Sequence, residues 1–394
     1  MRVGATATAA LRQVNKTLAL EVIREKGVVS RAELSRLLGL TRSTMSLIIE
    51  NMVAEGLVRP CGIGENTTGR KPMLYECDPT AGYVLGLDIG GTNIKCHLSN
   101  LVGQCLYSEH WETFQVPTSA EFMQQMVAAI RQMIRRAGLE QSGLKAMGVA
   151  SPGVVDPERG IVLGASPNLP EWNGLHLGEI LAAEFKVPVR VENDVNSALI
   201  GEHVFGVGRG RKDLALIAIS TGIGGALMLG GEIHRGATFG AGEIGYWLTD
   251  TSQIDRDWKP KGALESTCSA TAIAGRGSEL LGRPATAKDV FDAARQGNSA
   301  AQELVREIGR QLGMVASNLT SLLDMDMIIL GGGVMLSGDL LLPIVREVVE
   351  RHAIRAPEIT TSGLADEAGV LGAVHLALGS ALPEARLYLG GKWQ

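Results

Sequence analysis

The chain lacks the features that mark membrane-spanning, secreted and zinc-ribbon proteins. Its 394 residues include five cysteines, which form no C-x-x-C pair, and no apolar run is long enough to cross a bilayer. The first residues, MRVGATATAALRQVNK, lack the compact apolar stretch of a secretory signal. Free thiols without an export signal are typical of a reducing compartment, so we expect a cytoplasmic protein.

Composition and charge indicate a globular protein whose N-terminal part differs in charge from the rest. Hydrophobic residues make up 45% and charged residues 20%, as in ordinary globular proteins, and the length allows two or three domains. Many of the 50 glycines stand in short clusters beside apolar runs, which is typical of an α/β protein with tight strand turns. Residues 1–78 carry 11 Lys and Arg against 8 Asp and Glu, whereas the rest carries 26 against 34. A mildly basic N-terminal part is compatible with contacts to phosphate groups.

Residues 13–57 have the pattern of three short helices. The first is expected over residues 13–26, and glycines end the first two. Ser30 and Thr41 are placed as the N-caps of the second and third helices, and Glu33 completes a capping box with Ser30. Short helices joined by a glycine turn predict a helix-turn-helix.

The third of these helices has two contrasting faces. Its apolar residues, with the spacing that buries one face, are Met45, Ile48, Ile49 and Met52. The opposite face carries short polar and cationic side chains near the helix start, as reading of the major groove requires. We predict that DNA is contacted by Arg42, Ser43, Thr44 and Leu47.

Two short strands, at residues 57–58 and 73–75, flank a glycine-rich loop. The loop ends with Arg70 and Lys71, which are able to meet backbone phosphate as a basic wing. Helices and hairpin together predict a winged helix-turn-helix domain over residues 1–78. The alternative is a small helical domain that docks on the rest of the chain and touches no DNA.

Residues 79–394 contain the same motif twice, an apolar strand followed by a glycine turn and a second strand. Backbone N–H groups in the turns Gly90–Asn93 and Ser220–Gly225 would grip a polyphosphate from two sides, although plain hairpins also use such turns. Asp88 would hold Mg²⁺ through water, and Gly331–Gly333 would form a floor under a nucleotide base. The strands are expected over residues 83–88, 94–98, 214–219, 226–229 and 327–330.

Asp194 follows a strand and precedes an apolar helix. A carboxylate there could take the proton from a sugar hydroxyl that attacks the γ-phosphate of ATP. Capping of the helix would account for the same residue type, so both interpretations stay open.

These motifs together resemble the ROK family (repressors, open reading frames and kinases), and within it winged-helix regulators such as the xylose and N-acetylglucosamine repressors. The resemblance is strongest in STGIGGALMLGGEIHRGATFGAGEIG at 220–245, and it extends to SPGVVD at 151–156, PNLPEWNG at 167–174 and ADEAGVLGA at 365–373. It implies that residues 79–394 form an actin-like ATPase domain, with two ribonuclease-H-like α/β lobes around a cleft.

The resemblance also implies roles for particular residues. Sugar contacts are expected from Asn168, Asn193, Asp194 and Glu243, and Asp194 would be the catalytic base in a kinase. With Asp88 and Gly332 added from the motifs above, the nucleotide site is expected at Gly90, Gly91, Thr92, Thr221 and Gly222. Homodimers or homotetramers are usual in the family, and a dimer would present two recognition helices to a palindromic operator.

The chain departs from the family at a structural zinc site. The zinc is bound by a histidine after Glu-x-Gly and by three cysteines, but here Tyr246 stands at the histidine position. Residues 255–266, where the cysteines belong, contain none. Because four thiolate and imidazole ligands cannot be assembled from this segment, we predict no zinc. Mg-ATP is expected only if kinase activity is retained.

We therefore expect a repressor of carbohydrate-metabolism genes that binds operator DNA and responds to a sugar or sugar derivative in the cleft. The rival is an ATP-dependent hexose or amino-sugar kinase with a regulatory DNA-binding head. The intact first glycine turn and Asp194 favour the kinase, whereas the missing zinc ligands and the complete head count against it. A third hypothesis, a module that binds a transport protein, has no direct support in the sequence.

Overall fold

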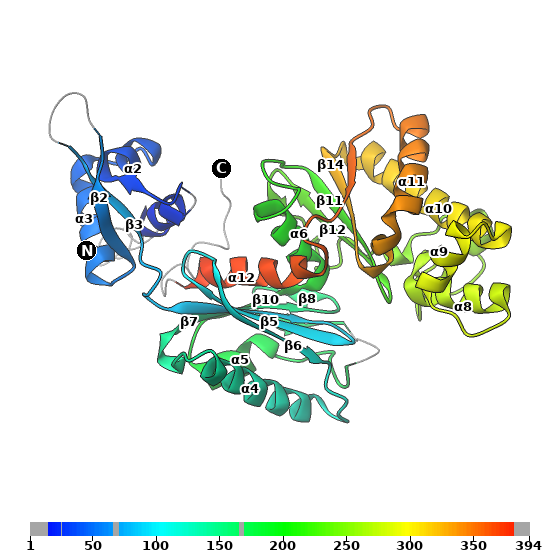
Figure 1. Ribbon diagram of the computed structural model, residues 1–394, viewed down its shortest axis with the longest axis horizontal. Helices are drawn as coiled ribbons and strands as arrows, with labels where there is room; N and C mark the ends of the chain where they lie inside the picture. The colour runs from blue at the N-terminus through cyan, green and yellow to red at the C-terminus, as the bar shows by residue number, and fades with distance from the viewer. Residues whose placement is uncertain (1–14, 25, 66–70, 165–168, 382–394) are drawn as a thin grey trace. The chain divides into compact units, whose positions relative to one another are not determined.

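A computed structural model describes residues 15–24, 26–65, 71–164 and 169–381 of the chain (Figure 1). By internal contacts the chain divides into two units. The first unit comprises residues 1–149, 156–191 and 373–394, and the second comprises residues 150–155 and 192–372.

The N-terminal part of the first unit contains helices and a small antiparallel sheet. Helical residues 15–24 are followed by α2 (Arg31–Leu37) and α3 (Arg42–Ala54). The three strands, in spatial order, are β1 (Val29–Ser30), β3 (Met73–Cys77) and β2 (Val58–Ile63). The helices bury one apolar core that includes Ala19, Leu20, Ile23, Leu34, Met45, Ile48, Ile49 and Met52. The four core residues of α3 are those predicted from the sequence.

Both predicted N-caps of this region are present. Ser30 Oγ accepts from the N–H of Glu33 at 3.2 Å, and Thr41 Oγ1 accepts from the N–H of Thr44 at 3.2 Å. The predicted capping box is only half formed within the described residues. The carboxylate of Glu33 lies 3.6 Å from Lys26 Nζ, because a cation at the end of the preceding helix competes for it.

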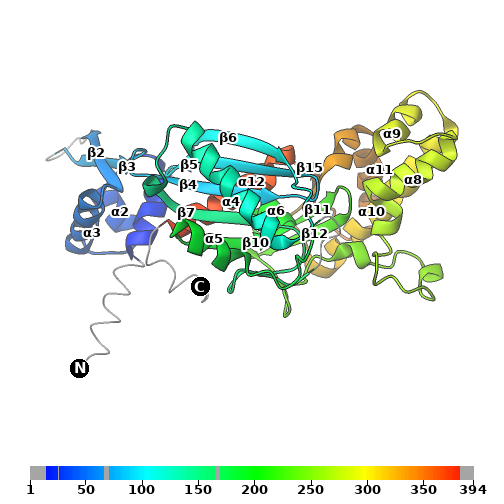
Figure 2. The same ribbon diagram turned by 90° about the horizontal axis from the view of Figure 1, so that it is seen from below.

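The larger sheet of the first unit has the strand order β10-β7-β4-β5-β6. Helices α4 (Ser119–Arg136) and α5 (Leu177–Phe185) lie on one of its faces (Figures 1 and 2). The strands are β4 (Tyr83–Ile89), β5 (Asn93–Asn100), β6 (Cys105–Glu112), β7 (Leu144–Ser151) and β10 (Val189–Asn193), and a separate pair is formed by β8 (Val155–Asp156) and β9 (Ile161–Val162).

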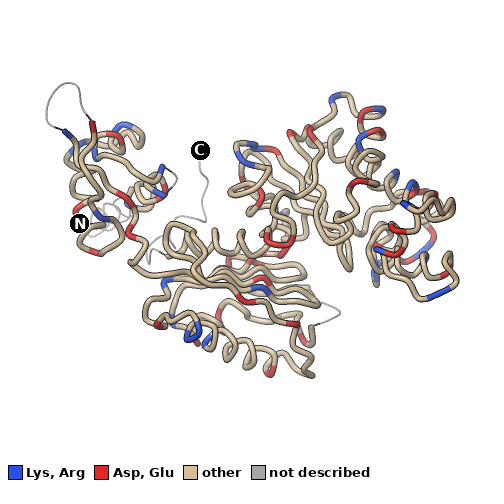
Figure 3. The backbone as a smooth tube through the Cα atoms, viewed as in Figure 1, with Lys and Arg blue, Asp and Glu red and all other residues tan. Residues whose placement is uncertain are grey.

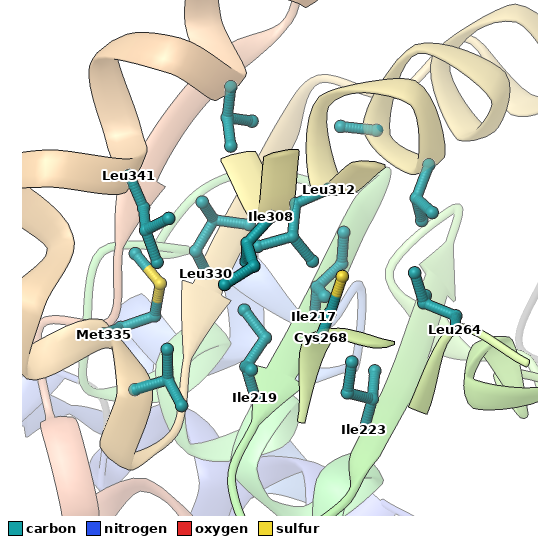
Figure 4. Packing of buried hydrophobic residues seen from close by; sticks show 14 of the residues in the cluster. Ile217, Ile219, Ile223, Leu264, Cys268, Ile308, Leu312, Leu330, Met335 and Leu341 are labelled. Carbon is teal, nitrogen blue, oxygen red and sulfur yellow. The ribbon is translucent and has the colours of Figure 1, made fainter. Parts of the chain in front are cut away.

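The second unit has a five-stranded sheet with the order β13-β12-β11-β14-β15. Its strands are β11 (Leu214–Ile219), β12 (Ile223–Leu229), β13 (Glu232–Ile233), β14 (Met327–Gly331) and β15 (Glu358–Thr361). Its helices are α6 (Asp194–Val204), α7 (Glu265–Cys268), α8 (Ala270–Leu281), α9 (Ala287–Arg295), α10 (Ser299–Leu323) and α11 (Gly338–His352). Figure 4 shows Ile219, Ile308 and Leu330 in the core between this sheet and α10. No described helix is both long enough and apolar enough to span a bilayer.

The two large sheets repeat one topology. In each, three consecutive strands form one side, and the sheet continues from the first of them through two later strands. Each predicted glycine turn joins the first two strands of its sheet, β4 to β5 and β11 to β12. The repeat is what two similar α/β halves predict.

The second glycine turn is shorter than the sequence suggested. β12 begins at Ile223, so Gly224 and Gly225 lie within the strand, paired with Ala218 and Ile217. A Cβ on Gly224 would lie 2.8 Å from a methyl of Val195, and one on Gly225 would lie 2.9 Å from the carbonyl of Gly242. These glycines therefore admit neighbouring segments close to the sheet.

Helix α6 crosses the start of α12 (Ala368–Ser380) through small residues. A Cβ on Gly372 would lie 1.8 Å from the carbonyl oxygen of Ser197, and Ser197 Oγ donates to the carbonyl of Gly369 at 2.8 Å. Any side chain at this crossing would force the two backbones apart.

We expect Gly372→Ala to destabilise the chain by about 3 kcal/mol, because overpacking at a backbone contact cannot be relieved by rotating a side chain. Gly379→Ala is the matched control, since Gly379 lies in the same helix and its Cβ would meet nothing within 4 Å. That change should be neutral or stabilising by up to about 1 kcal/mol. Urea unfolding of the full chain measures both, and equal effects would contradict the close crossing.

Candidate functional site

The Asn193–Asp194 pair stands where β10 ends and α6 begins. Asn193 is the N-cap, since its Oδ1 accepts from the N–H groups of Val195 and Asn196, each at 3.0 Å. Its Nδ2 donates to the carbonyl of Gly153 and to Asp194 Oδ1, each at 3.0 Å. All hydrogen-bonding positions of the Asn193 amide are thus occupied within the chain.

Asp194 therefore does not provide the helix cap. Its Oδ1 accepts from Val195 N at 2.9 Å and from Asn193, whereas Oδ2 accepts from none of the described residues. Burial raises the pKa of Asp194 to about 6, with a further contribution from the charge of Glu243 and opposition from the hydrogen bonds to Oδ1. A carboxylate with one unoccupied oxygen and this pKa is suited to accept a proton.

Glu192, the residue before this pair, carries a buried charge. Its Oε1 accepts from the N–H of Asn193 and from Asn196 Nδ2, each at 3.0 Å. Its Oε2 accepts from Arg235 Nε at 2.9 Å and Nη2 at 2.6 Å. The side chain is only 2% exposed, so the pair with Arg235 compensates a charge that water does not reach.

Glu265 lies close enough to Glu243 for its charge to affect the protonation of Glu243. Partial desolvation, reinforced by the charge of Glu265, raises the pKa of Glu243, although its side chain is exposed at the surface. Partial desolvation and the charges of both carboxylates also raise the pKa of the Tyr246 phenol, although half of this side chain is exposed. Through its effect on Asp194, Glu243 links these residues into one acidic group, whose carboxylates are suited to accept hydrogen bonds from the hydroxyls of a neutral ligand.

The first predicted phosphate turn is a tight hairpin turn. The N–H of Gly90 donates to the carbonyl of Asn93 at 2.9 Å, and Thr113 Oγ1 donates to the carbonyl of Gly90 at 2.7 Å. A Cβ on Gly90 would lie 2.7 Å from the Asn93 oxygen, so the turn itself requires glycine. The N–H groups of Gly91 and Thr92 donate to no group among the described residues, and such groups suit an anion.

Two hydrogen bonds from the start of α8 hold the second predicted phosphate turn. The N–H of Ala270 donates to the carbonyl of Ser220 at 2.8 Å, and Thr271 Oγ1 donates to that of Thr221 at 2.9 Å. Glu265 Oε2 accepts from the N–H of Ile223 at 3.1 Å and would lie 2.6 Å from a Cβ on Gly222. The acidic group thus reaches the edge of this turn.

Gly332 and Asp88 were the other predicted nucleotide-site residues. Gly332 has φ +86°, and its Cβ would lie 2.4 Å from the carbonyl of Ile219, so this position requires glycine. The N–H of Gly333 lies 3.4 Å from Ser220 Oγ, which brings the third glycine cluster beside the second turn. Asp88 lies near the end of β4, in the first unit.

The exposed face of α3 contains the predicted DNA contacts. Arg42 and Ser43 are exposed, and Leu47 is 43% exposed despite being apolar. Thr44 is half-buried, and its hydroxyl lies 2.8 Å from Thr41 Oγ1. Thr44 therefore also takes part in the start of the helix.

Most of the described charged residues of the N-terminal part stand in ion pairs. Figure 3 shows positive and negative positions mixed along this stretch. Among the described residues up to 78, the ion pairs are Lys16–Glu55, Lys26–Glu33, Arg31–Glu50, Arg59–Glu76 and Arg59–Asp78. The exposed cations that form no ion pair with described residues are Arg36, Arg42 and Lys71.

Two predicted site residues, Asn168 and Arg70, lie outside the described residues. Trp172, four residues after Asn168, is 1% exposed and packs edge-on against Phe122 with ring centroids 5.2 Å apart. Its ring is consequently part of the core.

The ROK family model matches residues 84–380. The chain belongs to the ROK family. A putative xylose repressor from Caldicellulosiruptor sp. (strain Rt8B.4) is 28% identical over 391 residues, covering 95% of this chain and 98% of that protein.

Two solved structures of ROK proteins are similar to this chain. A ROK transcriptional regulator, a homolog of the E. coli MLC protein, has a TM-score of 0.83 at 21% identity and covers 96% of this chain and 98% of its own, so the likeness is one of fold. A Streptomyces griseus ROK glucokinase in complex with glucose and AMPPNP has a TM-score of 0.63 at 30% identity. It covers 75% of this chain and 99% of its own.

The sequence did not single out three residues of this site, Glu192, Arg235 and Glu265. Glu192 was visible beside Asn193, but a lone glutamate at a strand end carries no sign of burial. Arg235 lies 43 residues after its partner Glu192, and Glu265 lies 42 residues after its partner Ile223. Only the tertiary structure reveals contacts between residues so far apart in the sequence.

The residues at the family's zinc position do not fit a zinc ion. Tyr246 replaces the histidine and is 50% exposed. Cys268 donates its thiol hydrogen to Gln311 Oε1 at 3.1 Å, and burial raises its pKa to about 12. A thiol that stays protonated is a poor zinc ligand.

We expect Asp194→Asn to stabilise the folded chain at high pH. The raised pKa means that the folded state binds the proton more tightly than the unfolded chain, so ionisation costs stability as pH rises from about 4 to about 6. Asparagine keeps the Oδ1 that accepts from Val195 and Asn193. The free energy of unfolding at about pH 8 should rise by about 1–3 kcal/mol, and the gain should vanish near pH 4.

Urea unfolding across this pH range measures the effect. Glu192→Gln is the opposite control, because it leaves Arg235 without its partner and should cost about 3 kcal/mol. A gain from Asp194→Asn that is independent of pH would show that the Asp194 carboxylate is not destabilised by its surroundings.

Proposed function

We propose that this protein is a sugar-responsive transcriptional repressor. The observation that carries the proposal is the extent of the similarities. The putative xylose repressor covers 95% of this chain, whereas the glucokinase covers 75% of it while using 99% of its own length. Since the family model begins at residue 84, the N-terminal part is what this chain has beyond the kinase-like region.

In this proposal residues 1–78 form a winged helix-turn-helix domain and residues 79–394 a sugar-binding ROK domain. α3 would be the recognition helix, and the β2–β3 hairpin, with Arg70 and Lys71, would be the wing. Arg42 supports this role because it begins α3 without an acidic partner. A cation at a helix N-terminus opposes the helix dipole, so its presence there is better explained by DNA phosphate or a base edge.

The sugar would bind at Asn168, Asn193, Asp194 and Glu243, to which we add Glu265. The hydrogen bonds of Asn193 are already satisfied, so a sugar contact there requires one of them to be exchanged. Support for a neutral sugar comes from the acidic group, which would repel an anion and accept hydrogen bonds from hydroxyls.

Sugar binding would act on operator affinity through a change between two conformations of a dimer or tetramer in the cytoplasm. Such control requires the sugar to prefer one conformation, typically by about 1–3 kcal/mol. In a dimer, two copies of α3 would meet a palindromic operator.

A second candidate function is an ATP-dependent sugar kinase. It is favoured by the raised pKa of Asp194, which suits a general base, and by the unoccupied N–H groups of Gly91 and Thr92. Mg-ATP would then be the phosphate donor, and the N–H groups of Gly91 and Thr92 would contact its phosphates.

We expect Arg42→Ala to weaken binding to the DNA upstream of the protein's own gene by about 1–3 kcal/mol, roughly fivefold to 150-fold. Thermal stability should be unchanged or slightly higher, because no ion pair with a described residue is lost. Arg310→Ala removes an equal charge from an exposed position of α10 and serves as the control. Fluorescence anisotropy with labelled DNA measures both, and unchanged affinity in Arg42→Ala would exclude α3 as the reading helix.

The kinase alternative is tested by ADP release from Mg-ATP with D-xylose, D-glucose and N-acetylglucosamine. A repressor without catalysis should release no ADP above its sugar-free rate, while at least one sugar changes DNA affinity. Turnover with one sugar that disappears in Asp194→Asn would instead support the kinase, with Asp194 as its base.

A further inference from the structure

The segment from Tyr246 to Gly262 is a closed loop in place of the family's zinc site. Its two ends meet through glycines, since a Cβ on Gly262 would lie 2.1 Å from the carbonyl oxygen of Gly245. A compact surface loop with adjoining ends has the form of an Ω-loop, which needs internal contacts to hold its shape.

Gln253 provides those contacts from the middle of the loop. Its Oε1 accepts from the N–H of Thr249 at 2.7 Å and from that of Asp250 at 3.1 Å. Asp250 in turn accepts from Ser252 N at 2.7 Å, which completes a capping box around the short helical turn Thr251–Gln253. The side-chain oxygen of Gln253 thus accepts hydrogen bonds from two backbone N–H groups.

The far side of the loop is hydrogen-bonded to the backbone of the same residue, Gln253. Trp258 Nε1 donates to the carbonyl of Gln253 at 2.7 Å, and the guanidinium carbon of Arg256 lies 4.3 Å from the centroid of the Trp258 ring. Trp247, next to Tyr246, packs against the core of the second unit. The loop is therefore held by the close contact of Gly245 with Gly262, by the hydrogen bonds of Gln253 and by the indole N–H of Trp258.

We propose that Gln253 holds residues 246–262 in place without a metal, taking over the structural task of the family's zinc. The loop thereby fixes Tyr246, whose phenol is close enough to Glu243 and Glu265 to be affected by their charges. Tyr246 would therefore keep its place beside these two carboxylates without zinc. This inference concerns the fold of the loop and does not require the proposed function.

Amide hydrogen exchange of the full-length protein tests the role of Gln253. In Gln253→Leu, which has similar bulk but no acceptor, the amides of Thr249 and Asp250 should exchange about tenfold faster or more. Gln253→Glu keeps the acceptor oxygen and should restore most of the protection. Lys259→Ala alters an exposed side chain of the same loop and should leave exchange unchanged. Unchanged exchange in Gln253→Leu, at a melting temperature equal to that of the unaltered protein, would overturn the proposal.

Metal dependence is tested on the unaltered protein. After dialysis we expect substoichiometric zinc, and addition of EDTA should leave both the melting temperature and the exchange of residues 247–258 unchanged. Retained stoichiometric zinc, with a lower melting temperature or faster exchange in EDTA, would mean that a metal holds the loop. Neither assay uses DNA or sugar, so their outcome is separate from that of the repressor proposal.

Discussion

The site of the second unit depends on how the buried charge of Glu192 is compensated. Its two oxygens receive four hydrogen bonds, from Asn193, Asn196 and the guanidinium of Arg235. A carboxylate so far from water is tolerated only when its acceptor positions are filled by well-placed donors. The result is that the end of β10, the first turn of α6 and the segment leading to Glu243 are fixed by one group. Asp194 and Glu243 can then be held near each other although their charges repel.

Local patterns predicted much of the fold, while tertiary packing decided what they missed. The apolar spacing in α3 and the run Leu214–Ile219 depend on neighbours a few residues away, and both elements form as expected. Gly224 and Gly225 were assigned to a turn because glycine permits turns, but they belong to a strand that Val195 and Gly242 approach closely. The choice between cap and base at Asp194 also depended on three-dimensional structure, which gives the cap to Asn193. Glu265 carried no local signal at all.

Several of the proposed functional groups oppose stability where they stand. Asp194 is easier to protonate than a free carboxylate, Arg42 begins a helix with the unfavourable sign of charge, and Gly91 leaves an N–H without a partner among the described residues. Natural proteins break local rules of this kind mainly where a ligand or partner restores the balance. In the functions proposed above, the balancing partners would be a proton for Asp194, a DNA phosphate or base for Arg42 and an anion for Gly91.

The last helix has a consequence for how the chain is made. α12 begins in the second unit and ends in the first, where Val374, Ala377 and Leu378 complete a core with Val84, Leu101 and Ala146. Domains generally fold in the order of their synthesis, from the N-terminus onward. Here a core begun by strands of residues 83–151 stays open on the ribosome until residues beyond 370 have emerged. A nascent chain halted shortly before that point would expose apolar surface in its first unit while its second unit was nearly complete, and such surface makes a chain prone to aggregate.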